Sequence, residues 1–136
     1  MLAKLKKKIQ EMLSSEAELA HKLRLTPNML SVAGIVLAFL SALLYATYQN
    51  RPLQLLFATV LLLASGFCDV LDGVLARLYQ QETSFGAFLD SLLDRYADVA
   101  IYVSMIIGRL CDVLLGLIAL TGSLLVSYSR ARAEAA

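Results

Sequence analysis

The sequence is poor in the residues that build disulfides and thiolate or imidazole metal sites. It contains two cysteines and one histidine in 136 residues. Cys68 and Cys111 stand alone, without a Cys-x-x-Cys spacing, so neither a disulfide nor a zinc site is indicated. The chain has no internal repeat and no low-complexity segment. Its formal net charge is only +1, which gives no indication of a nucleic-acid partner.

Apolar residues, in contrast, are abundant and come in long runs. They make up 59% of the chain, and the mean hydropathy of +0.69 lies outside the usual range of soluble domains. Runs long enough to cross the ~30 Å hydrocarbon core of a bilayer recur at about 29–48, 53–79, 85–107 and 113–128. We therefore predict an all-α, polytopic membrane bundle with four transmembrane helices.

The segment before the first run has a different character. Residues 1–25 are rich in Lys and Glu, with apolar residues at three- and four-residue spacing. This pattern predicts an amphipathic juxtamembrane helix on the lipid surface rather than a cleaved signal peptide, although a solvated helical extension fits it equally well. Most Lys and Arg precede the first apolar run or follow the fourth, so both termini are predicted to be cytoplasmic, in a multi-pass protein of the cell membrane.

Local signals set the helix boundaries. Thr26 before Pro27 has the form of a helix start, with a capping hydroxyl followed by a residue of fixed φ. Polar turns are predicted at 50–52, 80–84 and 108–112. The loop at 80–84 would be cytoplasmic, like the termini.

Five aspartates interrupt the second and third apolar runs. Asp69 and Asp72 are three residues apart, whereas Asp90, Asp94 and Asp98 follow at intervals of four. Each set therefore lines one face of its helix. If the two helices are antiparallel and joined by a short loop, the two sets lie at similar depth and can meet.

Such a cluster needs positive charge, because an unpaired charge in hydrocarbon is costly. Arg77 and Arg95 supply at most two charges, and Arg95 is expected on a different side of its helix from Asp94. Two divalent cations would balance four carboxylates, and an all-oxygen ligand set favours Mg²⁺ or Mn²⁺. We predict a metal site formed by Asp69, Asp72, Asp90 and Asp94.

Small residues accompany the acids. Gly73, Ala76 and Gly86 leave parts of both helix faces bare. This permits either close helix packing or the approach of a flat ligand to the backbone. Beside a metal, that ligand would be a nucleotide or a phosphate.

The acids and small residues together resemble a known signature. The pattern Asp69-x2-Asp72-Gly73-x2-Ala76-Arg77-x8-Gly86-x3-Asp90-x3-Asp94 matches, at every specified position and spacing, that of the CDP-alcohol phosphatidyltransferases. The resemblance runs from about residue 26 to the end of the chain. It implies transfer of a phosphatidyl-type group from a CDP-activated lipid to an alcohol hydroxyl, with release of CMP.

The same resemblance implies roles for individual residues. Asp69, Asp72 and Asp90 would bind two metal ions, while Asp94 would touch metal and act as the general base. The CDP site would be formed by Thr26, Asn28, Asp69, Asp72, Gly73, Ala76, Arg77 and Gly86. Family members usually have six helices, so 26–136 is expected to lack the last two, as a truncated copy or an unusually short member would. Family members also often form homodimers.

The segment SYSRARAE at 127–134 is similar to one in the inositol-phosphate-using branch, the phosphatidylinositol phosphate and archaetidylinositol phosphate synthases. A hydroxyl and two guanidinium groups suit a phosphate, so Ser127, Arg130 and Arg132 are predicted to bind that of myo-inositol 1-phosphate. The positive-inside rule alone would also explain the arginines. Glycerol phosphate, serine or inositol remain alternative acceptors. A divalent-cation transporter or a non-catalytic membrane subunit remain alternative functions.

Overall fold

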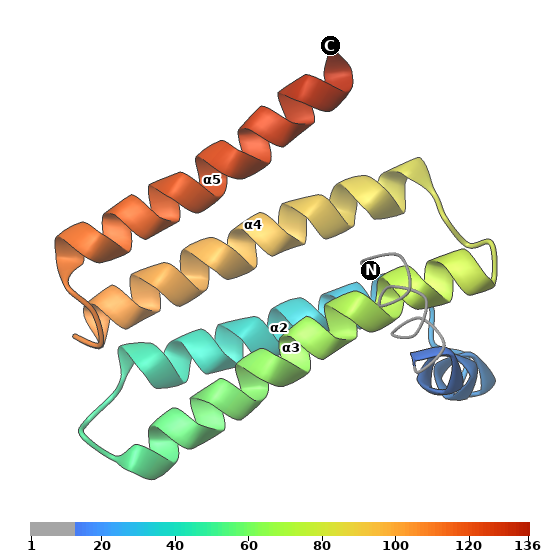
Figure 1. Cartoon of the computed structure of the whole chain (residues 1–136). Coiled ribbons are helices and arrows are strands. Elements are labelled where there is room, and N and C mark those ends of the chain that lie inside the picture. The colour runs from blue at the N-terminus through green and yellow to red at the C-terminus, as the bar shows by residue number, and fades with distance from the viewer. Residues whose placement is uncertain (1–12) are drawn as a thin grey trace, which may run out of the picture.

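The computed structural model describes residues 13–136, and this part of the chain is all helical. Residues 13–22 are helical and precede four long helices (Figure 1). The long helices are α2 (Pro27–Ala46), α3 (Pro52–Leu78), α4 (Ser84–Ile107) and α5 (Val113–Ala135). The all-α prediction is confirmed, and α5 continues beyond the predicted end of its apolar run.

Side-chain caps begin three of the long helices. The Thr26 hydroxyl accepts a hydrogen bond from the Met29 amide at 3.3 Å, with Pro27 in the first turn as predicted. Thr83 caps α4 in the same way, and Asp112 caps α5. Because these residues satisfy amides that lack a partner within the helix, they fix where each helix starts.

Left-handed residues end three helices without glycine. Arg24, Gln80 and Arg109 have φ values of 58°, 52° and 56°. In each case the next amide donates back across the last turn to a helix carbonyl, as in a Schellman motif. The polar turns predicted at 80–84 and 108–112 are therefore confirmed.

Helix α2 lies between α3 and α4 and contacts both along its length. Figure 1 shows α3 antiparallel to α2, and α5 outermost against α4. Serine hydroxyls join α2 to α3: Ser41 donates to the Ala58 carbonyl at 2.7 Å, and Ser65 donates to the Gly34 carbonyl at 2.8 Å. Small residues and such hydroxyl bonds are typical of helix contacts in membranes.

Three of the long helices in residues 13–136, α2, α3 and α5, are long and apolar enough to cross a membrane. Helix α4 carries Asp90, Asp94, Arg95 and Asp98, which exceeds the charge expected of a span judged by composition. Outward side chains such as Phe57 and Leu63 are 62% and 69% exposed, as lipid contact requires. The bundle is thus of the membrane type, and four spans stay a prediction.

The helix at 13–22 packs on protein. Ala17 and Ala20 are buried in a cluster with Leu71, Val74 and Leu75 of α3. The His21 ring stacks on Tyr79, with ring centroids 3.7 Å apart. Residues 1–12 of the predicted amphipathic segment lie outside the described residues, so its contact with the lipid surface stays a prediction.

Candidate metal and nucleotide site

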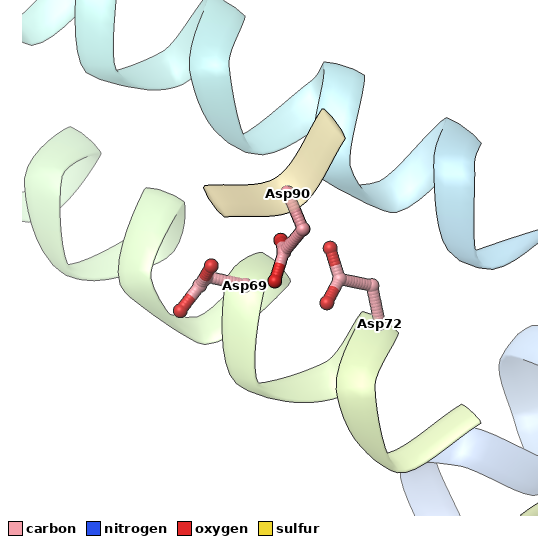
Figure 2. A group of neighbouring side chains, drawn as sticks. All are labelled: Asp69, Asp72 and Asp90. Atoms are coloured by element: carbon pink, nitrogen blue, oxygen red, sulfur yellow. The ribbon is translucent and has the colours of Figure 1, made fainter. Parts of the chain in front are cut away.

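Three of the predicted carboxylates meet in space. Asp69 and Asp72 from α3 and Asp90 from α4 each offer an oxygen, and these oxygens lie within 4.8 Å of one another. Figure 2 shows the Asp90 carboxylate reaching toward the other two. The predicted meeting of the two helix faces is confirmed for these three residues.

Asp72 is the most enclosed of the three acids. It is 3% exposed and accepts a hydrogen bond from the Ser31 hydroxyl of α2. Sequence reasoning missed Ser31, although a serine within an apolar run one turn after Pro27 was the available signal. This hydrogen bond links α2 to the carboxylate cluster.

Asp94 lies beside the cluster rather than in it. It lines a small hollow of about 30 Å³ that also borders Asp69, Asp90 and Ser31. The expectation that Arg95 points away from Asp94 is wrong, because Arg95 Nη2 lies 3.8 Å from Asp94 Oδ2. The guanidinium reaches back along the helix to its sequence neighbour.

A larger cleft of about 190 Å³ opens between α3 and α4 with α2 as its floor. It contains five of the residues predicted for the nucleotide site in addition to Asp72 and Asp90. These residues are Asn28, Gly73, Ala76, Arg77 and Gly86. Thr26 does not border this cleft and serves instead as the cap of the helix that carries Asn28.

The small residues keep the cleft open. A Cβ added to Gly86 would lie 2.9 Å from Thr83 Oγ1 and 3.3 Å from Asn28 Oδ1. Helices α3 and α4 do not pack closely on each other within 13–136. Of the two readings of these small residues, ligand approach fits the structure better than close packing of these two helices.

The donor set suits a hard cation. Oxygens bound to one Mg²⁺ are about 3.0 Å apart when adjacent and about 4.2 Å apart when opposite, so the three carboxylate oxygens, within 4.8 Å of one another, could share an ion once the side chains draw closer. The cluster contains no nitrogen or sulfur ligand. Arg77 borders the cleft and makes no ion pair with any of residues 13–136, which leaves its guanidinium available to an anionic ligand.

The predicted acceptor residues lie apart from the cleft. Arg130 is exposed at the end of α5, and its Nε pairs with Glu134 at 2.9 Å. Arg132 is also exposed, and Ser127 is half-buried. Neither they nor Arg130 border either hollow. Their phosphate-binding role stays a prediction.

A sequence model of the CDP-alcohol phosphatidyltransferases matches residues 24–136. The chain belongs to this family, as its signature predicted, and with its apolar helices it is an integral membrane protein. It is therefore a member of a transferase family.

Named relatives give more detail. The chain is 35% identical to an archaetidylinositol phosphate synthase of Pyrococcus horikoshii, over 100% of this chain and 70% of that protein. It is 40% identical to that of Methanothermobacter thermautotrophicus, over 85% and 57%. These matches agree with the branch that the 127–134 segment resembles.

A solved relative is similar in fold. The phosphatidylinositol phosphate synthase of Mycobacterium tuberculosis with CDP-DAG bound has a TM-score of 0.76 at 28% identity, covering 92% of this chain and 64% of its own. A second structure of that protein, with manganese and citrate, also has a TM-score of 0.76. The chain spans 57% to 70% of the length of these relatives.

Proposed function

We propose that this protein transfers a phosphatidyl- or archaetidyl-type group from a CDP-activated lipid to an alcohol hydroxyl, releasing CMP. The observation that carries the proposal is the three-carboxylate cluster at one edge of an open cleft. That cleft is lined by the signature residues Gly73, Ala76 and Gly86 and by a guanidinium without an ion-pair partner in 13–136. The pairing suits a diphosphate held between metal and arginine.

Asp69, Asp72 and Asp90 would hold Mg²⁺ or Mn²⁺, with Asp94 completing a site for two ions. Bound ions supply charge neutralisation of the diphosphate and of the departing CMP. The manganese in the solved relative supports this assignment. The Ser31 hydroxyl orients Asp72 for that role.

The nucleotide would occupy the cleft. Arg77 would bind the diphosphate, and its position at the cleft in the last turn of α3 supports this role. Asn28 offers a polar side chain from the first turn of α2, and Thr26 holds that turn in place. The bare faces at Gly73 and Gly86 allow the ligand to reach the backbone.

The reaction needs one proton transfer at the protein. The acceptor oxygen bonds to the lipid-side phosphorus of the donor, and the bond from that phosphorus to the oxygen of the CMP phosphate breaks. Asp94, at the edge of the cluster, takes the proton of the attacking hydroxyl. The lipid tails of donor and product stay in the bilayer throughout.

The preferred acceptor in this proposal is myo-inositol 1-phosphate, and the names of the Pyrococcus and Methanothermobacter relatives support it. Ser127, Arg130 and Arg132 would bind its phosphate. The donor is CDP-diacylglycerol or CDP-archaeol. We further propose a homodimer in the cell membrane, with the termini and the cleft on the cytoplasmic side, consistent with the distribution of Lys and Arg.

The structure gives the transporter alternative little support. A transporter needs a continuous polar path across the membrane, whereas Asp98, the acid that follows Asp94 on α4, is paired with Arg95 at 2.8 Å. The remaining acids of the pattern gather beside the cleft.

The proposal is tested by CMP release from CDP-diacylglycerol and CDP-archaeol, with myo-inositol 1-phosphate, inositol, glycerol 3-phosphate or serine in separate reactions. Release with inositol phosphate is expected, and Asp94→Asn should lower it by about 10²-fold or more. The Arg130→Gln/Arg132→Gln variant should lose release with inositol phosphate. No release with any acceptor contradicts the proposed reaction, and undiminished release by the arginine variant contradicts the acceptor site.

A further inference from the structure

A polar cluster of Arg95, Asp98 and Ser123, separate from the carboxylate cluster, joins α5 to α4 one turn beyond Asp94. Asp98 Oδ2 accepts a hydrogen bond from Arg95 Nη1 at 2.8 Å and another from the Ser123 hydroxyl at 2.6 Å. Arg95 Nη1 also lies 3.5 Å from Ser123 Oγ. Two side chains, one from α4 and one from α5, therefore donate to the same carboxylate oxygen of Asp98.

The Arg95 guanidinium sits between two carboxylates and treats them unequally. Its Nη1 makes a short charge-assisted hydrogen bond to Asp98, whereas its Nη2 stays 3.8 Å from Asp94. The second distance is beyond hydrogen-bond range. Asp94 therefore feels a nearby positive charge while its oxygens stay free of a direct bond to that guanidinium.

The Arg95 side chain is also buried at its Nε atom. Arg95 Nε is buried and has no hydrogen-bond partner in 13–136. Because Nε makes no hydrogen bond, the hydrogen bonds of Nη1 to Asp98 and Ser123 hold the guanidinium in position. Since Asp94 lies on the same side of the helix one turn before Asp98, it is the next carboxylate available if those bonds are lost.

We propose that Asp98 and Ser123 are positioning residues that hold the Arg95 guanidinium off Asp94, so that Asp94 remains available to metal and to the acceptor proton. The inference rests on the proposed function. It gives α5 a part in the site through a single hydroxyl, and it gives Asp98 a role other than metal binding.

The arrangement predicts an effect of definite sign. In Asp98→Asn the guanidinium loses its charged partner and pairs with Asp94, so the affinity for Mn²⁺ should fall about 10- to 100-fold, as for other groups that orient metal ligands. Replacing Arg95 as well, in Asp98→Asn/Arg95→Gln, removes the competing cation and should restore the affinity. A purely structural role predicts that the double variant is no better than the single one.

Ser123 provides a milder and matched pair of variants. Ser123→Ala removes one hydrogen bond and should weaken Mn²⁺ binding about two- to tenfold, while Ser123→Thr keeps the hydroxyl and the affinity. Thr121→Ala on the same helix is the control, because within residues 13–136 the Thr121 hydroxyl donates only to the Leu117 carbonyl of α5 itself. It should bind Mn²⁺ like the original protein.

The measurement is a Mn²⁺ titration of the full chain in nanodiscs, followed by the paramagnetic resonance of the free ion, without lipid donor or acceptor. Loss in Asp98→Asn with recovery in the double variant supports the inference. Unchanged affinity in Asp98→Asn, no recovery in the double variant, or equal affinities of Ser123→Ala and Ser123→Thr each overturn it. Absence of Mn²⁺ binding by the original protein instead overturns the proposed metal function, and the inference with it.

Discussion

At the scale of single residues, Gly86 is where the shape of the cleft is most sensitive. It lies in the first turn of α4, and its amide donates to the Thr83 cap at 2.9 Å. A methyl group there would crowd both that cap and the Asn28 amide. The absence of a side chain at this position therefore lets α4 lie close to Asn28 of α2 without displacing it.

We expect Gly86→Ala to raise the KM for the CDP-lipid about tenfold, the equivalent of about 1.4 kcal/mol, because the added methyl must displace Asn28 or Thr83. Steady-state kinetics of CMP release at varied donor concentration measures this. Gly122→Ala is the matched control, since a Cβ at Gly122 meets nothing within 4 Å. An unchanged KM in Gly86→Ala would mean that the nucleotide does not use this wall.

Sequence reasoning found the acids but not the hydroxyls that serve them. An aspartate in an apolar run is conspicuous, because burying its charge demands a partner. Ser31 and Ser123 are not conspicuous, because a serine in a helix commonly bonds to the backbone of its own helix. Only the packing of α2 and α5 shows that each of these hydroxyls reaches an aspartate on another helix.

At the scale of the helices, the C-terminal ends of α2 and α4 approach each other closely, and this contact fixes how α4 lies on α2. A Cβ at Gly108, which directly follows the last residue of α4, would clash with the Tyr45 carbonyl oxygen near the end of α2. The contact is with backbone, which cannot rotate away. The two helix ends must therefore separate if any larger residue is placed there.

We expect Gly108→Ala to destabilise the folded protein by about 1–3 kcal/mol, the usual range for overpacking a close contact. Denaturant unfolding in mixed micelles, followed by tyrosine fluorescence, measures the change. Gly66→Ala in α3 is the control, because it meets no atom within 4 Å and should be neutral or slightly stabilising. Equal stabilities of the two variants would show that α2 and α4 do not meet closely at this end.

Helix boundaries were predictable because caps, prolines and polar turns are local signals. Pro27 opens a helix where the sequence indicated, and Thr26 caps it, whereas Pro52, predicted as the end of a turn, is the first residue of α3. The placement of α2 between α3 and α4 was not predictable, because it depends on small residues on three helices at once. The sequence pattern alone had allowed α3 and α4 to pack directly on each other.

At the scale of the whole molecule, the polar site is screened from its surroundings by the arrangement of the helices. Helix α2 forms the floor of the cleft, and Ser123 of α5 donates a hydrogen bond to Asp98, whose charge is paired with Arg95 within α4. The outward faces are large and apolar. A polar cleft inside an apolar exterior is what an enzyme needs when its donor and product are lipids and its leaving group is a soluble nucleotide.

The central claim is that the clustered carboxylates hold the metal through which the diphosphate binds. It is tested most directly by calorimetric titration of CDP into the full chain with and without Mn²⁺, beside Asp72→Asn and a control, Asp112→Asn, whose carboxylate only caps α5. We predict that CDP binds only with Mn²⁺, that Asp72→Asn weakens binding at least about tenfold, and that Asp112→Asn does not. CDP binding that is indifferent to Mn²⁺ and to the loss of the Asp72 charge would contradict the account.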